Sequence, residues 1–167
     1  MKLAFLHCGL QSQLAAQYLV EKHNFKEISI QQTLKKITST HFGTDDDNFI
    51  KTFSAALSTI DKYALIKYIS SELNNTTNVV ISDVSTLNEY YSILIEGFVP
   101  VKFDTKEFNY EQSLTDIPML TVSSESNLAQ LQESVQVLLD NYQTLAQNRT
   151  KGGVIKFIDD QEEKADE

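Results

Sequence analysis

VVISDVSTLNE, residues 79–89, is the stretch from which the fold of this 167-residue chain can be inferred. Its first three residues are β-branched and apolar, which is typical of a strand buried on both faces of a sheet. A polar turn follows at Ser82–Asp83, and Leu87–Glu96 has the apolar spacing of a helix that stops at Gly97. The stretch therefore predicts a buried strand, a turn and a helix, in that order.

The same order of elements recurs in both directions along the chain. Leu3–Leu6 is another buried-strand pattern, and a turn at Cys8–Gly9 leads into apolar residues at helical spacing up to Lys22. Further strands are predicted at Phe25–Ile30, Val99–Phe103 and Leu120–Val122, and further helices at Leu34–Phe42, Phe49–Ile60, Ala64–Leu73 and Leu128–Leu145. Such alternation predicts an α/β fold of three layers, with a mostly parallel sheet flanked by helices.

Two local predictions concern the boundaries of these elements. Pro100 lacks a backbone N–H, which favours an edge position or a bulge for the strand that contains it. Asp47 or Asn48 has the side chain that suits the N-cap of the helix that starts at Phe49.

No linker interrupts residues 1–158, which predicts a single domain over that range. After Gly152–Gly153, residues 154–158 have the pattern of a last strand or of an ordered segment. Residues 159–167 carry six acidic side chains and one lysine, and we expect this tail to be disordered and solvated. The tail holds more than half of the net charge of −9, so the net charge says little about the folded part.

The basic residues are almost all of one type. Lysine and arginine together number 14, and Arg149 is the one arginine. An acidic chain with a single guanidinium is poorly suited to bind nucleic acid, and it has few groups that clamp phosphate in a bidentate manner. Composition therefore argues against a nucleic-acid partner.

Cys8 is the one cysteine, which excludes an internal disulfide and a cysteine-rich zinc site. The apolar run at the start is too short for a secretory signal, and no run is long enough to cross a membrane. We therefore expect a cytoplasmic protein without a membrane partner.

Three segments resemble the P-loop nucleotide kinases, and most closely the deoxynucleoside monophosphate kinases of bacteriophages. MKLAF at residues 1–5 is similar to the first strand of that family, and LAAQYLVEKHNFKEIS at 14–29 is similar to its first helix and return strand. VVISDVSTLNE is similar to the hallmark strand and turn of this family. The resemblance covers about the first hundred residues and implies a P-loop kinase-like fold.

The sequence departs from this family where the family carries out its chemistry. The phosphate loop that follows the first strand is a variant of G-x-x-x-x-G-K-[ST], whose amides and lysine hold phosphate. Here His7–Leu14 has one glycine, and no lysine lies between Lys2 and Lys22. Ser85 stands at the position that resembles the substrate-binding arginine. The resemblance therefore implies a degenerate member of the family.

We expect no catalytic residue and no metal ligand, and a vestigial nucleotide-binding site at most. That site would comprise Gly9, Gln11, Ser12, Gln13, Asp83 and Ser85. Its amides at a helix N-terminus favour an anion, whereas a plain turn capped by Ser12 or Gln11 is the simpler interpretation. Asp83 either holds magnesium or caps a helix. Asn88 and Glu89 match the family and are expected to support helix packing.

Two classes of function follow from these observations. The first is a catalytically inactive kinase-like protein of bacteriophage origin that acts as an interaction or structural component. We expect it to have a protein partner or to form a homo-oligomer, and to need no cofactor. If a phage encodes it, we expect it in the host cytoplasm, with a place in the virion as an alternative. The alternative is a divergent deoxynucleoside monophosphate kinase or nucleotide-binding phosphotransferase, which would use a magnesium nucleotide. A protein that binds a nucleotide without turning it over lies between the two.

Overall fold

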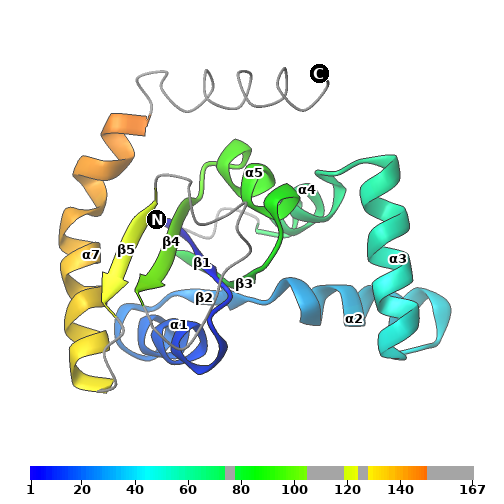
Figure 1. The fold of residues 1–167 in the computed structure, drawn as a ribbon, viewed down its shortest axis with the longest axis horizontal. Coiled ribbons are helices and arrows are strands. Elements are labelled where there is room, and N and C mark those ends of the chain that lie inside the picture. Colours follow the sequence, from blue (N-terminus) through cyan, green and yellow to red (C-terminus); the bar gives the residue numbers. More distant parts are fainter. Residues whose placement is uncertain (74–77, 105–118, 124–127, 150–167) are drawn as a thin grey trace.

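A five-stranded sheet forms the centre of the protein (Figure 1). The computed structural model describes residues 1–73, 78–104, 119–123 and 128–149. Within them every strand pair is parallel, and the strand order is β2-β3-β1-β4-β5. The strands are β1 (Lys2–Leu6), β2 (Lys26–Ile28), β3 (Val79–Val84), β4 (Val99–Asp104) and β5 (Leu120–Ser123).

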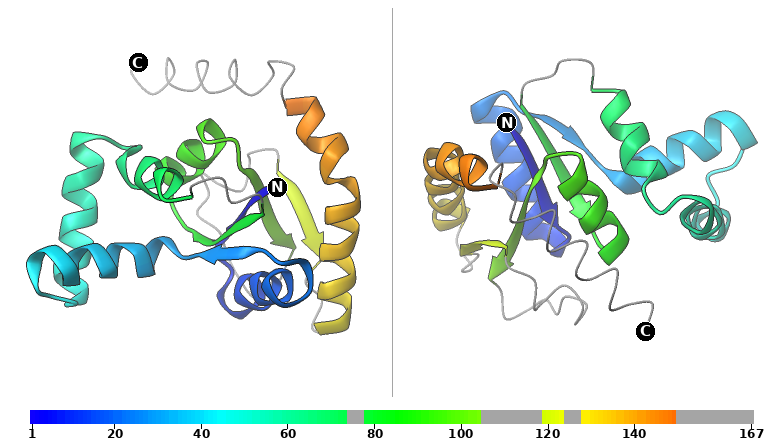
Figure 2. Two further views of the ribbon diagram at one scale, coloured as in Figure 1. Left: turned by 180° about the vertical axis from the view of Figure 1, so that it is seen from behind. Right: turned by 90° about the horizontal axis from the view of Figure 1, so that it is seen from above.

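Helices cover both faces of this sheet, as Figure 2 shows from two further directions. In chain order they are α1 (Gly9–His23), α2 (Ile30–Phe42), α3 (Asp47–Ile60), α4 (Ala64–Ser71), α5 (Leu87–Ile95) and α7 (Leu128–Arg149). Helices α1 and α7 pack on one face, and α2, α4 and α5 pack on the other. The predicted α/β class, with three layers and a parallel sheet, is therefore confirmed.

The alternation of side chains in the central strands separates two hydrophobic cores. Leu3 and Phe5 of β1 point into the core with α1 and α7, whereas Ala4 and Leu6 point into the core with α2, α4 and α5. All four side chains are fully buried. A parallel strand that is apolar on both faces can only lie between two layers of helices. This explains why the short apolar runs Leu3–Leu6 and Val79–Ile81 occupy the middle of the sheet.

The prediction that Pro100 marks an edge strand or a bulge was wrong. Strand β4 lies between β1 and β5, and Pro100 pairs in regular register with Ala4 of β1. On the other side, the first pair between β4 and β5 is Val101 with Leu120. Pairing with β5 therefore begins only after the residue that lacks an N–H, and the interior position of the proline is tolerated.

Two predicted boundaries also differ from those observed. Helix α3 is capped by Asp46, whose Oδ1 accepts a hydrogen bond of 2.9 Å from the N–H of Phe49, so the predicted cap at Asp47 or Asn48 was wrong by at least one residue. The predicted strand at Phe25–Ile30 is shorter, because Ser29 is the N-cap of α2 and Ile30 is its first residue. The capping hydroxyl accepts from the N–H of Gln32 at 3.0 Å.

Several predictions lie outside the described residues. They concern the break at Gly152–Gly153, the segment 154–158, the acidic tail 159–167 and the limit of the domain at residue 158. Among the helices of the described ranges, none has the length and apolar character needed to cross a membrane.

Candidate functional site

The candidate site lies where β1 and β3 end, side by side in the middle of the sheet. Ligands of open α/β sheets bind outside the carboxyl ends of the strands, so this edge is where chemistry is expected. The connection from β1 to α1 and the turn from β3 to α5 meet here. The N–H of His7, just after β1, donates to the carbonyl of Val84 at the end of β3 (2.7 Å).

The connection between β1 and α1 consists of His7 and Cys8 alone. The N–H of Cys8 donates to the hydroxyl of Ser12 at 3.2 Å, and this hydroxyl donates to the carbonyl of Gly9, also at 3.2 Å. Ser12 is fully buried, and Gly9 has a positive φ of 52°, which a residue with a side chain rarely adopts. The connection is thus a tight turn that is closed onto its own helix.

This turn has little in common with a loop that wraps around a phosphate. A G-x-x-x-x-G-K-[ST] loop presents several backbone N–H groups to its ligand, together with a lysine. Here one of the N–H groups is bonded to Ser12, and Lys22 lies in the last turn of α1, at the end opposite to the connection. What remains is the start of an ordinary helix, in which the N–H of Gln11 already donates to the carbonyl of Cys8 at 3.2 Å.

Asp83 links the end of β3 to the start of α2. Its Oδ2 accepts hydrogen bonds from the hydroxyl of Ser29 (2.6 Å) and from the N–H of Gln31 (3.0 Å), and its Oδ1 accepts one from the N–H of Ile30 (2.7 Å). A carboxylate at this place satisfies N–H groups that no helical carbonyl reaches, and it interacts favourably with the positive end of the helix dipole. Asp83 therefore caps a helix, although not the one that follows it in the sequence.

Ser85, the predicted site residue in the turn after β3, also forms hydrogen bonds within the protein. The carboxylate of Glu89 accepts from the N–H of Ser85 (2.8 Å), from its hydroxyl (3.1 Å) and from the N–H of Thr86 (3.0 Å). The hydroxyl of Thr86 accepts in return from the N–H of Glu89, which completes a capping box at the start of α5. Glu89 therefore stabilises the helix, which agrees with its expected supporting role.

A cavity of about 510 Å³ opens beside these turns, between the sheet edge and helices α2, α3 and α4. This volume is within the usual range for small-molecule sites. Of the predicted residues, Asp83 and Ser85 line the cavity, and Asn88 and Glu89 line it too. Its floor is apolar, with Ile30, Leu34, Ile50, Leu65 and Ile66. Two cations also line it, Lys51 of α3 and Lys62 of the following turn.

Sequence reasoning missed Lys51 and Lys62, because each stands in a helical or turn segment far from the two motifs. The predicted residues of the first turn are not brought together in this cavity: Gly9, Gln11 and Ser12 are not among its lining residues. Gln13 instead lines a neighbouring cavity of about 420 Å³, which also contains His7, Gln17 and Asp83.

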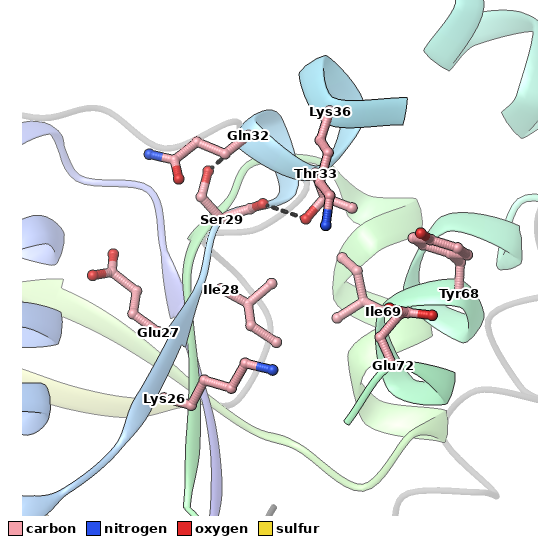
Figure 3. Close-up of a pocket in the computed structure, with 10 residues that line it drawn as sticks. All are labelled: Lys26, Glu27, Ile28, Ser29, Gln32, Thr33, Lys36, Tyr68, Ile69 and Glu72. Carbon is pink, nitrogen blue, oxygen red and sulfur yellow. Dashed lines mark hydrogen bonds between the residues drawn. The ribbon is translucent and has the colours of Figure 1, made fainter. Parts of the chain in front are cut away.

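A further cavity, of about 430 Å³, lies along the outer edge of β2 (Figure 3). Its charged side chains are of both signs: Lys26 and Glu27 come from β2, Lys36 from α2, and Glu72 follows α4. None of the predicted site residues lines it. We assign no chemistry to this cavity.

The described part of the chain contains no cluster of three or more histidine, cysteine, aspartate or glutamate side chains that could hold a metal ion. Cys8 is a buried free cysteine. The three hydrogen bonds of Asp83 already use three of the about four acceptor sites of a carboxylate.

Comparison with known proteins does not assign this chain to a family. No protein-family description and no curated protein matches the sequence. A gluconokinase from Sinorhizobium meliloti 1021 is a similar solved structure, with 11% identity, a TM-score of 0.49, and coverage of 86% of this chain and 96% of the gluconokinase. These values assign neither a family nor an activity. The all-parallel strand order of this chain itself agrees with the P-loop kinase fold predicted from the sequence.

Replacement of Asp83 tests its role as a helix cap. Asp83→Asn removes the negative charge and replaces one carboxylate oxygen by an NH₂ group. This group would face the N–H and O–H donors at the start of α2. We expect it to lower the free energy of unfolding by about 2–3 kcal/mol, measured by urea denaturation. The control is Asp140→Asn, at an exposed position of α7 that accepts a hydrogen bond from Gln136. A similar loss in both variants would contradict the assigned role.

Proposed function

We propose that this chain is a kinase-like protein that does not transfer phosphate and that acts as an interaction or structural component. The observation that carries the proposal is the connection between β1 and α1. It has two residues, and the hydroxyl of Ser12 accepts from the N–H of Cys8 at 3.2 Å, where a phosphate-binding loop would present that N–H to a nucleotide. A triphosphate would have to break this turn before it could bind there.

The distribution of positive charge supports the same proposal. Phosphoryl transfer depends on fixed cations around the transferred group, and an arginine finger alone contributes about a thousandfold or more to the rate. Arg149 is the one arginine of the sequence and stands at the last residue of α7. Asp83, the carboxylate that would have to bind magnesium, instead accepts three hydrogen bonds at the start of α2.

Titration with magnesium nucleotides tests this proposal. We expect Mg-ATP, Mg-GTP and deoxynucleoside monophosphates to leave the melting temperature unchanged at millimolar concentration, and no diphosphate to form. A nucleotide at a hundredfold excess over its Kd would add about 2.7 kcal/mol to the free energy of unfolding. A saturable rise with Mg-ATP, or turnover of any of these nucleotides, would contradict the proposal.

The cavity lined by Lys51 and Lys62 supports a second candidate, a nucleotide-binding protein. Two cationic side chains over an apolar floor would suit a phosphorylated ligand with a hydrophobic ring, such as a nucleoside monophosphate. This candidate needs no phosphate loop. In one form of this candidate the nucleotide binds and is not turned over. In the other form, another subunit supplies the positive charges that phosphoryl transfer requires.

A pair of matched double variants tests the second candidate. If a monophosphate binds in this cavity, replacing Lys51 and Lys62 by alanine will weaken its binding at least about tenfold, because each removes a charge-assisted contact. Isothermal titration calorimetry measures this. The control replaces Lys26 and Lys36, which line the separate cavity of Figure 3. Equal weakening by both double variants would exclude the cavity as the binding site.

A protein partner, the bacteriophage origin and the cytoplasmic location are part of the proposal as expectations from the sequence. A kinase-like fold without the phosphate-binding groups is consistent with a protein that functions by binding a partner on its surface.

A further inference from the structure

A polar cavity of about 420 Å³ lies between α1, the start of α2 and the carboxyl ends of β2 and β3. It is the cavity that Gln13 lines, and its volume is within the usual range for small-molecule sites. Four glutamines, two serines, two acidic residues and a histidine line it, and among the described residues no lysine, arginine or apolar side chain does. Most small-molecule sites are mainly apolar, so this lining indicates a very polar ligand.

Strand β3 is irregular where it borders the polar cavity. Two successive pairs between β1 and β3 involve Ile81 and Val84, which are three positions apart, whereas their partners on β1 are two positions apart. β3 therefore has one extra residue here, as in a β-bulge. Ile81 and Val84 both pack into the core with α2, and the residues between them, Ser82 and Asp83, both line the cavity. Bulges are frequent next to functional sites, where they redirect side chains.

The hydroxyl of Ser82 lacks a partner within the described part of the protein. Ser82 is 4% exposed and is the most buried residue of the lining, yet its hydroxyl has no hydrogen bond to any described residue. Buried polar groups are normally hydrogen-bonded, because an unsatisfied one is costly. A molecule in the cavity would supply the missing partner.

Three glutamine side chains around Ser82 are also available for a ligand. The carboxamides of Gln13, Gln31 and Gln32 form no hydrogen bond with a described residue, whereas that of Gln17 donates to a neighbouring glutamate at 2.7 Å. All three belong to exposed residues, and they reach the cavity from two different helices. A ligand therefore meets three free carboxamides at the rim and one buried hydroxyl below them.

The hydrogen-bonding capacity of these groups selects the class of ligand. A carboxamide has two donor hydrogens and an acceptor oxygen, and a serine hydroxyl also donates and accepts. An anion could use only the donors and would face the carboxylates of Glu27 and Asp83. An ammonium group could use only the acceptors. A ligand hydroxyl can use both, and a polyhydroxylated molecule offers several of them.

The neighbouring cavity of about 510 Å³ has a different lining, although it shares His7, Gln31 and Asp83 with the polar cavity. It has the cations Lys51 and Lys62 and an apolar floor, which suit a phosphate and a hydrophobic ring. Among the described residues the polar cavity has neither feature, so a nucleotide fits it poorly.

We propose that the polar cavity binds a neutral polyhydroxylated molecule, either a monosaccharide or a linear polyol. The hydroxyl of Ser82 bonds one ligand hydroxyl deep in the cavity, and the carboxamides of Gln13 and Gln31 bond others at the rim. Glu27, which points to the side of β2 opposite to Ile28 (Figure 3), accepts from a further hydroxyl and disfavours anionic sugars.

Titration of the ¹⁵N-labelled protein with small probes tests the ligand class. We expect glucose or sorbitol at millimolar concentration to shift the side-chain NH₂ signals of Gln13 and Gln31 in a saturable way. Glucuronate should bind at least about tenfold more weakly, because its carboxylate faces two acidic side chains, and so should putrescine, a diamine that cannot use the donors. Binding of glucose alone supports the proposal with a sugar ring as the ligand, and binding of sorbitol alone supports it with an open chain.

Single substitutions test the contacts. Ser82→Ala should weaken binding of the neutral probe about tenfold, and it should leave the urea midpoint unchanged or raise it, because the hydroxyl has no described partner in the free protein. Gln13→Ala should weaken binding to a similar extent. The matched control is Gln11→Ala, two positions earlier in α1, which lines neither cavity and should bind like the wild type.

Three outcomes would overturn the proposal. They are no saturable shift with either neutral probe, tighter binding of glucuronate or putrescine than of glucose and sorbitol, and equal weakening by Gln11→Ala and Gln13→Ala. The proposal does not rest on the proposed function. Glucose and sorbitol carry no phosphate, so either of the two can fail while the other stands, and the nucleotide titrations show which one has failed.

Discussion

The carboxylate of Asp83 is the contact on which the arrangement of the functional edge depends. It stands at the end of the central strand β3 and accepts three hydrogen bonds from the first residues of α2, more than fifty positions earlier in the chain. The contact fixes where α2 starts and in which direction it leaves the sheet. The position of α3, which follows α2, and the walls of the cavity between them depend on that direction.

The polar side chains at this edge accept hydrogen bonds from backbone N–H groups of the protein itself. This limits the chemistry that the edge can perform. Ser12 binds the connection after β1, Asp83 binds the start of α2, and Glu89 binds the start of α5. In a kinase the equivalent edge has to offer its amides and carboxylates to a nucleotide and a metal ion. The cations that line the neighbouring cavity, Lys51 and Lys62, come instead from α3 and the turn after it. The second candidate function accordingly places anion binding beside the sheet and not at its edge.

Local patterns in the sequence were enough to predict the layers of the fold, because the apolar runs at Leu3–Leu6 and Val79–Ile81 can only be buried between helices. The prediction that β4 lies at the sheet edge was wrong. Pairing with β5 begins at Val101, after Pro100, so the missing N–H of the proline leaves that pairing intact. Helix capping was one of the two interpretations of Asp83, but the sequence could not show that the capped helix is α2, because the partners of the carboxylate are set by the tertiary structure. The helical pattern of residues 49–60 was correct, but periodicity alone cannot show that most of this apolar face lacks a covering element within the described chain.

The central claim is that the turn after β1 no longer receives a nucleotide. The most direct measurement is the change in amide chemical shifts, by two-dimensional NMR of the ¹⁵N-labelled protein, as Mg-ATP is added to millimolar concentration. The account predicts that the amides of Cys8, Gly9 and Gln11 do not shift, even if resonances around Lys51 and Lys62 do. A saturable shift of the three turn amides would contradict it.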